Sequence, residues 1–319
     1  MRELNKADFK LFKQLVSLSQ NSLKIAMERY LKARYDNCII TNEYVVAIGD
    51  IPIALVAHLD TVYKVPVRDL YYDKEQGVIW SPEGLGADDR AGIFAIIKIL
   101  QSGLRPSIIL TTDEEKGGLG AIALGKDPCP IKGLKYLIEL DRQGENDCVF
   151  YNCYCPEFVN YVESFGFEKE QGSFSDISFL MPKWNVCGVN LSVGYIEEHS
   201  YSEHLFVECL LETIEKVQKM LMSKDIPSFY YDEIKSALSK YDTIFGQHCD
   251  KCKKLFSEYE LFPVKGVNSK IKFYCSDCMI NSVEWCVVCQ EPYETEPGDS
   301  EYMCKECLCS KTSKSSSEK

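Results

Sequence analysis

RPSIILTTDEEKGGLGA, residues 105–121, places three consecutive acidic residues after an apolar run and two threonines. The run that ends at Leu110 predicts a buried β-strand, and the glycines after the acids indicate the start of a short helix. Adjacent residues at a strand end point in different directions, so Glu114 and Glu115 should have different partners. Taken alone, this stretch is explained better by a solvated strand end than by a functional site.

The segments around this stretch alternate between apolar strands and helices. Apolar residues at helical spacing predict one or two helices over residues 7–34 and an amphipathic helix over 202–221, with Ser202 as its N-cap. The other expected elements are a hairpin at 38–49, strands at 51–60, 106–112, 135–141 and 185–194, and helices at 88–100 and 118–125. This alternation predicts an α/β sandwich with a largely buried sheet.

The composition limits the functional classes. The 319 residues suit one large and one smaller domain, and the net charge of −12 argues against nucleic acid or an anionic membrane as the main partner. No apolar run approaches the ~20 residues of a membrane span. The N-terminal stretch MRELNKADFK lacks the apolar region of a secretory signal, so we expect a cytoplasmic protein.

The 16 cysteines are unevenly distributed along the chain. Seven are scattered through the first 245 residues, and the other nine lie between residues 249 and 309. A chain without an export signal uses such cysteines for metal binding or keeps them reduced. We therefore predict a first domain at 1–245, a zinc-binding module at 246–309 and a disordered polar tail at 310–319.

Four Cys-x-x-Cys pairs carry the prediction for the second domain. The spacing lets both thiolates of a pair face one ion, and two pairs complete a four-cysteine zinc site, so four pairs predict two structural zinc ions. The pairs are Cys249/Cys252, Cys275/Cys278, Cys286/Cys289 and Cys304/Cys307. Sequential ribbons would join the first pair to the second, whereas a cross-brace would join the first to the third. Cys309 is left over, and His248 could replace a thiolate.

The charge of this module indicates what it contacts. Residues 248–319 contain 10 lysines, no arginine and 12 acidic residues, so a basic stripe for nucleic acid is absent. Structural support or contact with a protein partner is the better hypothesis for this zinc-ribbon-like domain.

Histidines and acids gather at the ends of the predicted strands of the first domain. The carboxyl ends of neighbouring strands meet at one crevice in α/β sheets, so residues from separate motifs should converge there. Histidine and carboxylate ligands suit zinc, and one carboxylate can bridge two ions. The residues are His58 and Asp60, Asp88 and Asp89, Glu114 and Glu115, Asp141, and His199 with Glu203.

The order of these motifs resembles the di-zinc exopeptidases of the aminopeptidase superfamily (clan MH). That order is His-x-Asp, Asp-Asp-Arg-x-Gly, Glu-Glu-x-Gly, Asp and His-Ser-x-x-Glu, over roughly residues 5–222. GADDRAG, HSYSE and GSFSDISFL are most similar to the glutamyl-aminopeptidase/cellulase M branch. Residues 59–87 and 142–198 are too short for the inserted domains of larger members, so the layout resembles minimal single-domain aminopeptidases.

The resemblance implies a fold and a mechanism. The fold would be a three-layer α/β/α sandwich of the phosphorylase/hydrolase-like type, with a mixed sheet. His58 and Asp141 would hold one catalytic zinc or other divalent ion, Glu115 and His199 a second, and Asp88 would bridge them. A metal-bridging hydroxide would attack the peptide or amide bond, Glu114 would be the general base and acid, and Asp60 would orient His58.

Two rival functions stay open, and the first differs from an aminopeptidase only in the group of the substrate that the protein must bind. An N-acyl amino-acid deacylase could use the same scaffold, and an inert domain joined to an adaptor-like zinc module would have no activity. A residue that binds the free terminus of the substrate should lie near His199, the last of the predicted metal ligands. The candidates are Asp176, Tyr195, Glu197 and Glu198, whereas His204 is expected on the solvated side of its helix.

Overall fold

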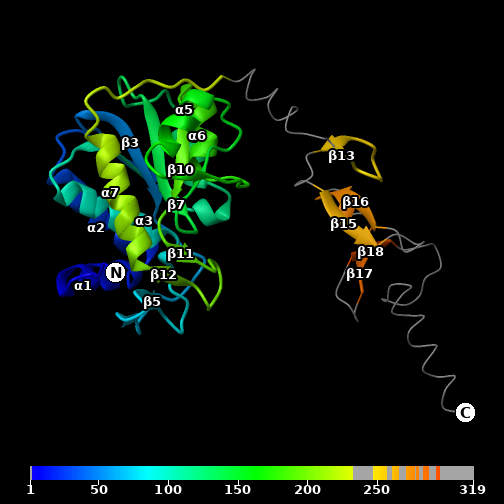
Figure 1. Cartoon of the computed structure of the whole chain (residues 1–319), viewed down its shortest axis with the longest axis horizontal. Coiled ribbons are helices and arrows are strands. Elements are labelled where there is room, and N and C mark those ends of the chain that lie inside the picture. Colours follow the sequence, from blue (N-terminus) through cyan, green and yellow to red (C-terminus); the bar gives the residue numbers. More distant parts are fainter. Residues whose placement is uncertain are drawn as a thin grey trace, which may run out of the picture. The chain divides into compact units, whose positions relative to one another are not determined.

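A computed structural model of the chain divides into two compact units, Met1–Ser236 and Ala237–Lys319 (Figure 1). The structure describes residues 2–232, 247–256, 261–265, 271–276, 278–279, 283–286 and 292–294. Within these ranges, none of the helices is long and apolar enough to cross a membrane. Each unit is described by itself.

The first unit is built on an eight-stranded mixed sheet with the order β1-β2-β6-β3-β7-β10-β8-β9. The central neighbours β6, β3, β7 and β10 run parallel, whereas β1–β2, β2–β6 and β8–β10 pair antiparallel. The strands of this unit are β1 (Cys38–Ile40), β2 (Tyr44–Ala47), β3 (Ile51–His58), β4 (Tyr71–Asp73), β5 (Val78–Trp80), β6 (Pro106–Thr111), β7 (Tyr136–Arg142), β8 (Asp147–Val149), β9 (Glu168–Lys169), β10 (Gly188–Ser192), β11 (Tyr195–Ile196) and β12 (His204–Phe206).

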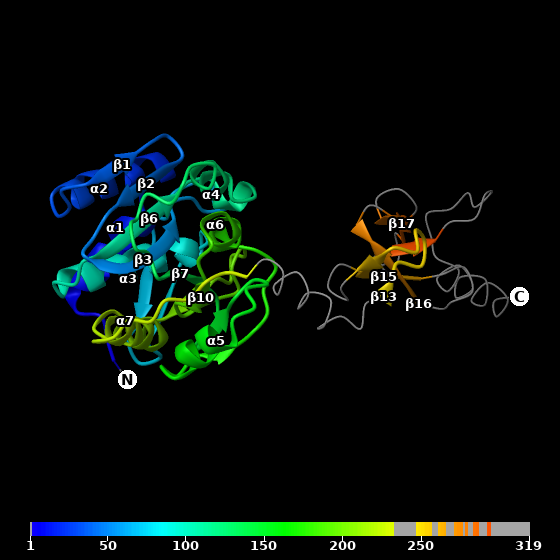
Figure 2. The same cartoon turned by 90° about the horizontal axis from the view of Figure 1, so that it is seen from above.

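Helices cover both faces of this sheet. In Figure 2, α3 and α7 lie on one face and α4 and α6 on the other, so the central strands are buried on both sides. The helices are α1 (Lys6–Val16), α2 (Gln20–Lys32), α3 (Ala87–Gln101), α4 (Leu119–Leu124), α5 (Pro156–Glu163), α6 (Asp176–Trp184) and α7 (Val207–Leu221), with a short 3₁₀ turn η1 (Glu114–Lys116). The predicted α/β fold with a mixed sheet between helical layers is confirmed.

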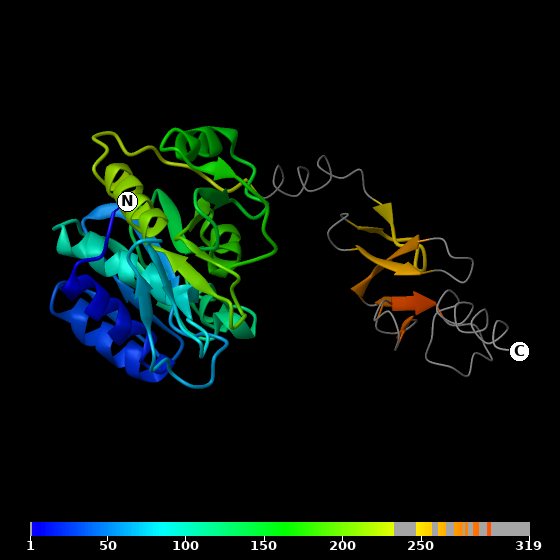
Figure 3. The same ribbon diagram turned by 60° about the horizontal axis from the view of Figure 1, so that its bottom comes forward.

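The N-terminal helical segment forms two helices because polar caps interrupt it. The side chain of Asn5 accepts hydrogen bonds from the N–H groups of Ala7 and Asp8 at the start of α1. Ser17 ends α1, and the Ser19 hydroxyl accepts from the N–H of Ser22 at the start of α2. The two helices, dark blue in Figure 3, lie next to each other, and α1 packs against α3.

The prediction for residues 202–221 was wrong at its N-terminal end. Helix α7 begins at Val207 with Phe206 as its N-cap, so Ser202 caps nothing. His204–Phe206 instead form β12, which pairs with β5 and β11 in a second sheet of order β11-β12-β5-β4. His204 is therefore a half-buried strand residue, with its Nδ1 2.8 Å from the carbonyl oxygen of Ser202, and does not lie on a solvated helix face.

One glycine explains how closely α3 approaches the sheet. A Cβ added to Gly92 would overlap the carbonyl oxygen of Leu140 in β7 and the carboxylate of Asp89. The Gly92 N–H also donates to that carboxylate at 2.9 Å. The glycine of the Asp-Asp-Arg-x-Gly motif thus sets the distance between the helix that carries Asp88 and the strand that carries Asp141.

The second unit contains short strands around cysteines. Its described strands form a two-stranded sheet, β13-β14, and a four-stranded sheet of order β16-β15-β18-β17. They are β13 (Gln247–His248), β14 (Leu255–Phe256), β15 (Leu261–Lys265), β16 (Ile271–Cys275), β17 (Val283–Trp285) and β18 (Pro292–Glu294). The predicted tail at 310–319 lies outside the described residues.

Candidate metal centre

The predicted metal ligands come from separate elements that end at one edge of the large sheet. His58 is the last residue of β3, η1 follows β6 after two residues, and Asp141 lies near the end of β7. These three strands are parallel neighbours, so their carboxyl ends meet. Asp88 at the start of α3 and His199 after β11 complete the cluster.

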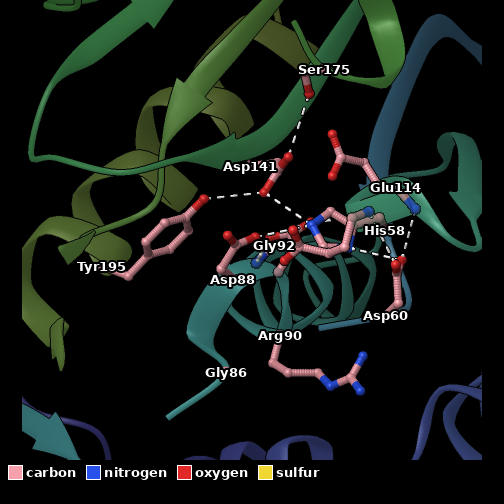
Figure 4. Close-up of polar contacts among 12 residues, drawn as sticks. His58, Asp60, Gly86, Asp88, Arg90, Gly92, Glu114, Asp141, Ser175 and Tyr195 are labelled. Carbon is pink, nitrogen blue, oxygen red and sulfur yellow. Dashed lines mark hydrogen bonds and ion pairs between the residues drawn. The ribbon is translucent and has the colours of Figure 1, made fainter. Parts of the chain in front are cut away.

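His58 lies at the buried side of the cluster. Its side chain is 1% exposed, and its Nδ1 is 3.2 Å from Asp60 Oδ1. Its Nε2 lies 3.0 Å from Asp88 Oδ1 and 3.4 Å from Asp141 Oδ1 (Figure 4). One ring nitrogen is therefore held by Asp60, while the other points at two acids.

His199 repeats this arrangement on the exposed side. Its Nε2 lies 3.0 Å from Asp88 Oδ2 and 3.0 Å from Glu115 Oε2. The contact with Asp88 is the first cause that raises the pKa of His199, to about 9. Asp88 thus turns one carboxylate oxygen toward each histidine.

These side chains form two ligand groups that share Asp88. In the groups His58–Asp88–Asp141 and Asp88–Glu115–His199, one ligand atom per residue lies within 4.8 Å of the others. Burial, with the charge of Asp88 and Glu114, raises the pKa of Asp141 well above its usual range, although His58 opposes this. Imidazole and carboxylate donors crowded at this spacing fit two divalent cations, which would offset the repulsion between the acids.

The two adjacent glutamates have different surroundings. The Glu115 carboxylate contacts His199, whereas the Glu114 side chain extends toward Asp141 while its backbone nitrogen faces Asp60 (Figure 4). Glu114 is buried, and this burial, followed by the charges of Asp88 and Glu115, raises its pKa to about 7, with His58 acting in the opposite direction. A carboxyl group with that pKa can accept and return a proton near neutral pH.

Asp60 connects His58 to the glutamates. Besides the contact with the His58 ring, its Oδ1 accepts the N–H of Glu114 at 3.0 Å and its Oδ2 the N–H of Glu115 at 3.1 Å. A single carboxylate therefore fixes both the histidine orientation and the backbone of η1.

Two residues have positioning roles that we did not predict. Both oxygens of Glu203 accept backbone N–H groups, from Gly86 at 2.7 Å and from Asp88 at 3.0 Å. Asn190 accepts the N–H of Asp141 at 2.9 Å and donates to its carbonyl oxygen at 2.8 Å. The HSYSE motif contains Glu203 but does not reveal which groups Glu203 contacts. Nothing in the sequence marks Asn190 as a residue that positions Asp141.

The candidate substrate readers are placed differently. Tyr195 is buried, and its hydroxyl donates to Asp141 Oδ1 at 3.1 Å. Asp176 has no exposed surface, and its Oδ2 accepts the hydroxyl of Thr111, so its burial argues against contact with a substrate terminus. Glu197 and half-buried Glu198 precede His199, and Glu197 is exposed.

The second unit brings the first two cysteine pairs together. Ligand atoms of Cys249, Cys252, Cys275 and Cys278 lie within 4.8 Å of one another, with 3.9 Å between the sulfurs of Cys252 and Cys275. This is the sequential arrangement, and a cross-brace between the first and third pairs is not formed by these residues. Cys286 is buried, whereas the other cysteines of the expected second site, Cys289, Cys304 and Cys307, and the leftover Cys309 lie outside the described residues.

Comparison with solved structures identifies the fold of the first unit. A TET aminopeptidase from a marine-sediment Thaumarchaeota archaeon matches 70% of this chain and 98% of its own, at 13% identity and a TM-score of 0.55. A tripeptidase from Staphylococcus aureus matches 68% of this chain and 98% of its own, at 14% identity and a TM-score of 0.54.

This chain has the fold of these peptidases. Aminopeptidase PepT from Bacillus cereus is also similar, at 15% identity over 66% of this chain and 96% of its own, with a TM-score of 0.50. No protein-family model and no curated protein matches this chain. These structures confirm the fold that the motif order implied.

Proposed function

We propose that the first unit is a zinc-dependent hydrolase of peptide bonds, most simply an aminopeptidase. The observation that carries the proposal is the position of Asp88, whose two carboxylate oxygens each lie 3.0 Å from a different histidine. A carboxylate that faces two ligand groups in this way suits a two-metal hydrolytic site, in which the ions lie about 3.5–4 Å apart.

We assign the residues of the two ligand groups to two ions. His58 and Asp141 would hold one, Glu115 and His199 the other, and Asp88 both. When bound, two such ions lower the pKa of a water molecule between them and polarise the substrate carbonyl group. Tyr195 and Asn190 keep Asp141 in place, and Asp60 keeps Nε2 of His58 directed into the site.

Glu114 would move the proton. Its carboxylate would take a proton from the attacking water and pass it to the nitrogen of the leaving amine. Its backbone is fixed by the hydrogen bond to Asp60, and the residue as a whole is 8% exposed, which separates it from bulk solvent. Proton transfer of this kind contributes about 10²–10⁴-fold to a reaction rate.

The four-cysteine cluster would hold a structural zinc ion. Four thiolates close the coordination sphere of zinc, so an ion there would stabilise the fold of the second unit and leave no open position for a substrate. We propose that the third and fourth cysteine pairs bind a second such ion. We also propose that the second unit binds a protein partner.

The test is an activity panel with the zinc-loaded protein. Free-amine dipeptides and N-acyl amino acids should be offered in parallel, and we expect release of amino acids from the dipeptides. A metal chelator should abolish this activity and added zinc should restore it. Cleavage of neither class by the fully zinc-loaded protein would refute the proposed function, and cleavage of the N-acyl class alone would make the protein a deacylase.

A further inference from the structure

A pocket of 480 Å³ lies next to the metal centre on the side of Asp60 and Glu115. Its volume falls within the range of small-molecule pockets, about 300–1,000 Å³. Most of its wall is apolar and comes from the end of α1 and the loop after β3. The apolar residues include Val16, Leu18, Val62, Val65 and Leu85.

Arg90 is a buried cation in the wall of this pocket. Its side chain donates from Nη1 to the carbonyl oxygen of Leu59 and from Nη2 to that of Leu18 at 3.1 Å. Both acceptors are uncharged, and Nε has no hydrogen-bond partner among the residues that the structure describes. The guanidinium group is therefore fixed in position without a carboxylate bonded to it.

Two lysines and a threonine also line this pocket. The lysines are Lys64 and Lys116; Lys116 pairs with Asp113 at 2.6 Å, whereas no described carboxylate lies within ion-pair distance of Lys64. The buried hydroxyl of Thr61 likewise has no partner among the described residues. The two acids of the pocket wall are already engaged, since Asp60 accepts backbone N–H groups and Glu115 contacts His199.

The pocket lies across the metal centre from Tyr195, one of the predicted substrate-binding residues. Figure 4 shows Asp60 on the opposite side of His58 from Tyr195, and Arg90 below His58 with its side chain directed away from Asp141. A peptide that spans the metal centre would therefore place one end in this pocket. Arg90 and Lys64 would attract the C-terminal carboxylate of such a peptide and would repel its N-terminal amine.

We propose that this pocket binds the leaving residue of a short peptide, with the C-terminal α-carboxylate toward Lys64 and Arg90 and an apolar side chain against the valines and leucines. The substrate class would then be dipeptides and similarly short peptides with a free carboxylate. This inference rests on the proposed function, because it assigns the pocket to a peptide that crosses the metal centre.

A binding experiment tests the inference without requiring turnover. The probes are an Ala-Leu analogue whose amide bond is reduced to a methylene-amine, its C-terminal amide, and the analogue amide with Glu in place of Leu. Calorimetry on the zinc-loaded full chain should show that the free acid binds at least about tenfold more tightly than its amide. Lys64→Ala should lower the ratio of the affinity for the free acid to the affinity for the amide, and Lys64→Glu should lower this ratio further. Lys126→Ala changes an exposed lysine outside the pocket, so it should leave the ratio as in the wild type.

Three results would overturn the inference: equal binding of acid and amide by the wild type, a ratio unaffected by both Lys64 variants, or preference for the Glu-containing amide. The last would assign the pocket to an acidic side chain. Hydrolysis of Ala-Leu and Ala-Leu-amide is measured in parallel. Equal hydrolysis of both with equal binding would refute only the inference, whereas discrimination in binding without any hydrolysis would refute only the proposed function.

Discussion

Glu203 accepts the backbone N–H of Asp88 at 3.0 Å, although 115 positions separate the two residues. Its other oxygen accepts the N–H of Gly86, so one buried side chain holds the loop that leads to the shared ligand. Burial raises the pKa of Glu203 to about 7, although these two N–H groups act to lower it. The loop between β11 and β12 thus contributes both His199 and a support for Asp88.

We expect Glu203→Ala to weaken both stability and metal binding. It leaves two buried N–H groups without acceptors, which should lower the free energy of unfolding by about 1–3 kcal/mol per group. Zinc affinity should fall about 10–100-fold, as for other residues that orient ligands. Urea unfolding and competition with a zinc chelator measure the two effects. Glu203→Gln keeps one acceptor, so its stability and zinc affinity should lie between those of the wild type and Glu203→Ala. Glu168→Ala, at an exposed strand position, should match the wild type in both.

The contrast between Glu203 and the other acids shows where sequence interpretation succeeded. His58, Glu114, Glu115 and Asp141 follow apolar runs, and parallel strand ends must meet, so their convergence could be predicted. The partners of Glu203 and Asn190 are contacts between distant segments that no local pattern records. β12 was missed for a related reason, since three residues are too few to show a strand period, and the pairing with β5 decides their conformation.

Gly92→Ala should separate α3 from β7. The added methyl group would overlap the carbonyl oxygen of Leu140, so the helix must shift and the free energy of unfolding should fall by about 1–3 kcal/mol. Because Asp88 lies on that helix, zinc binding should weaken as well. Gly103→Ala is not a suitable control because Gly103 has a positive φ of 91°. Gln101→Ala, at the exposed last residue of the same helix, is the matched control. Wild-type stability in Gly92→Ala would contradict the close packing.

The metal content should be four zinc ions per chain, two of them labile. Ions held by histidines and carboxylates at an open site exchange more readily than ions in closed four-cysteine sites. Elemental analysis before and after mild chelation should therefore show a loss of about half the zinc. Cys252→Ser together with Cys275→Ser should remove one of the resistant ions. A total of two, both resistant, would leave the catalytic assignment without support.

The first unit should fold without the second. A chain that ends at residue 245 keeps Phe229, which is buried against Tyr136 and Phe158 at ring-centroid distances of 5.9 and 4.8 Å. We expect it to be folded and to bind two metal ions. A chain that ends at residue 224 loses this aromatic contact and should unfold at a lower urea concentration. If the chain ending at 245 is insoluble while the full chain is soluble, the two units depend on each other.

Glu114 and Glu115 should differ in what their substitution removes. Glu114→Gln keeps the shape of the side chain but removes the base, so both labile metal ions should stay bound while turnover falls by at least about two orders of magnitude. Glu115→Gln replaces a charged group that lies 3.0 Å from His199, so one zinc ion should be weakened or lost and activity should partly return with excess zinc. Metal content by elemental analysis and turnover on a free-amine dipeptide separate the two cases. Loss of metal from Glu114→Gln with full retention in Glu115→Gln would mean that the two roles are reversed.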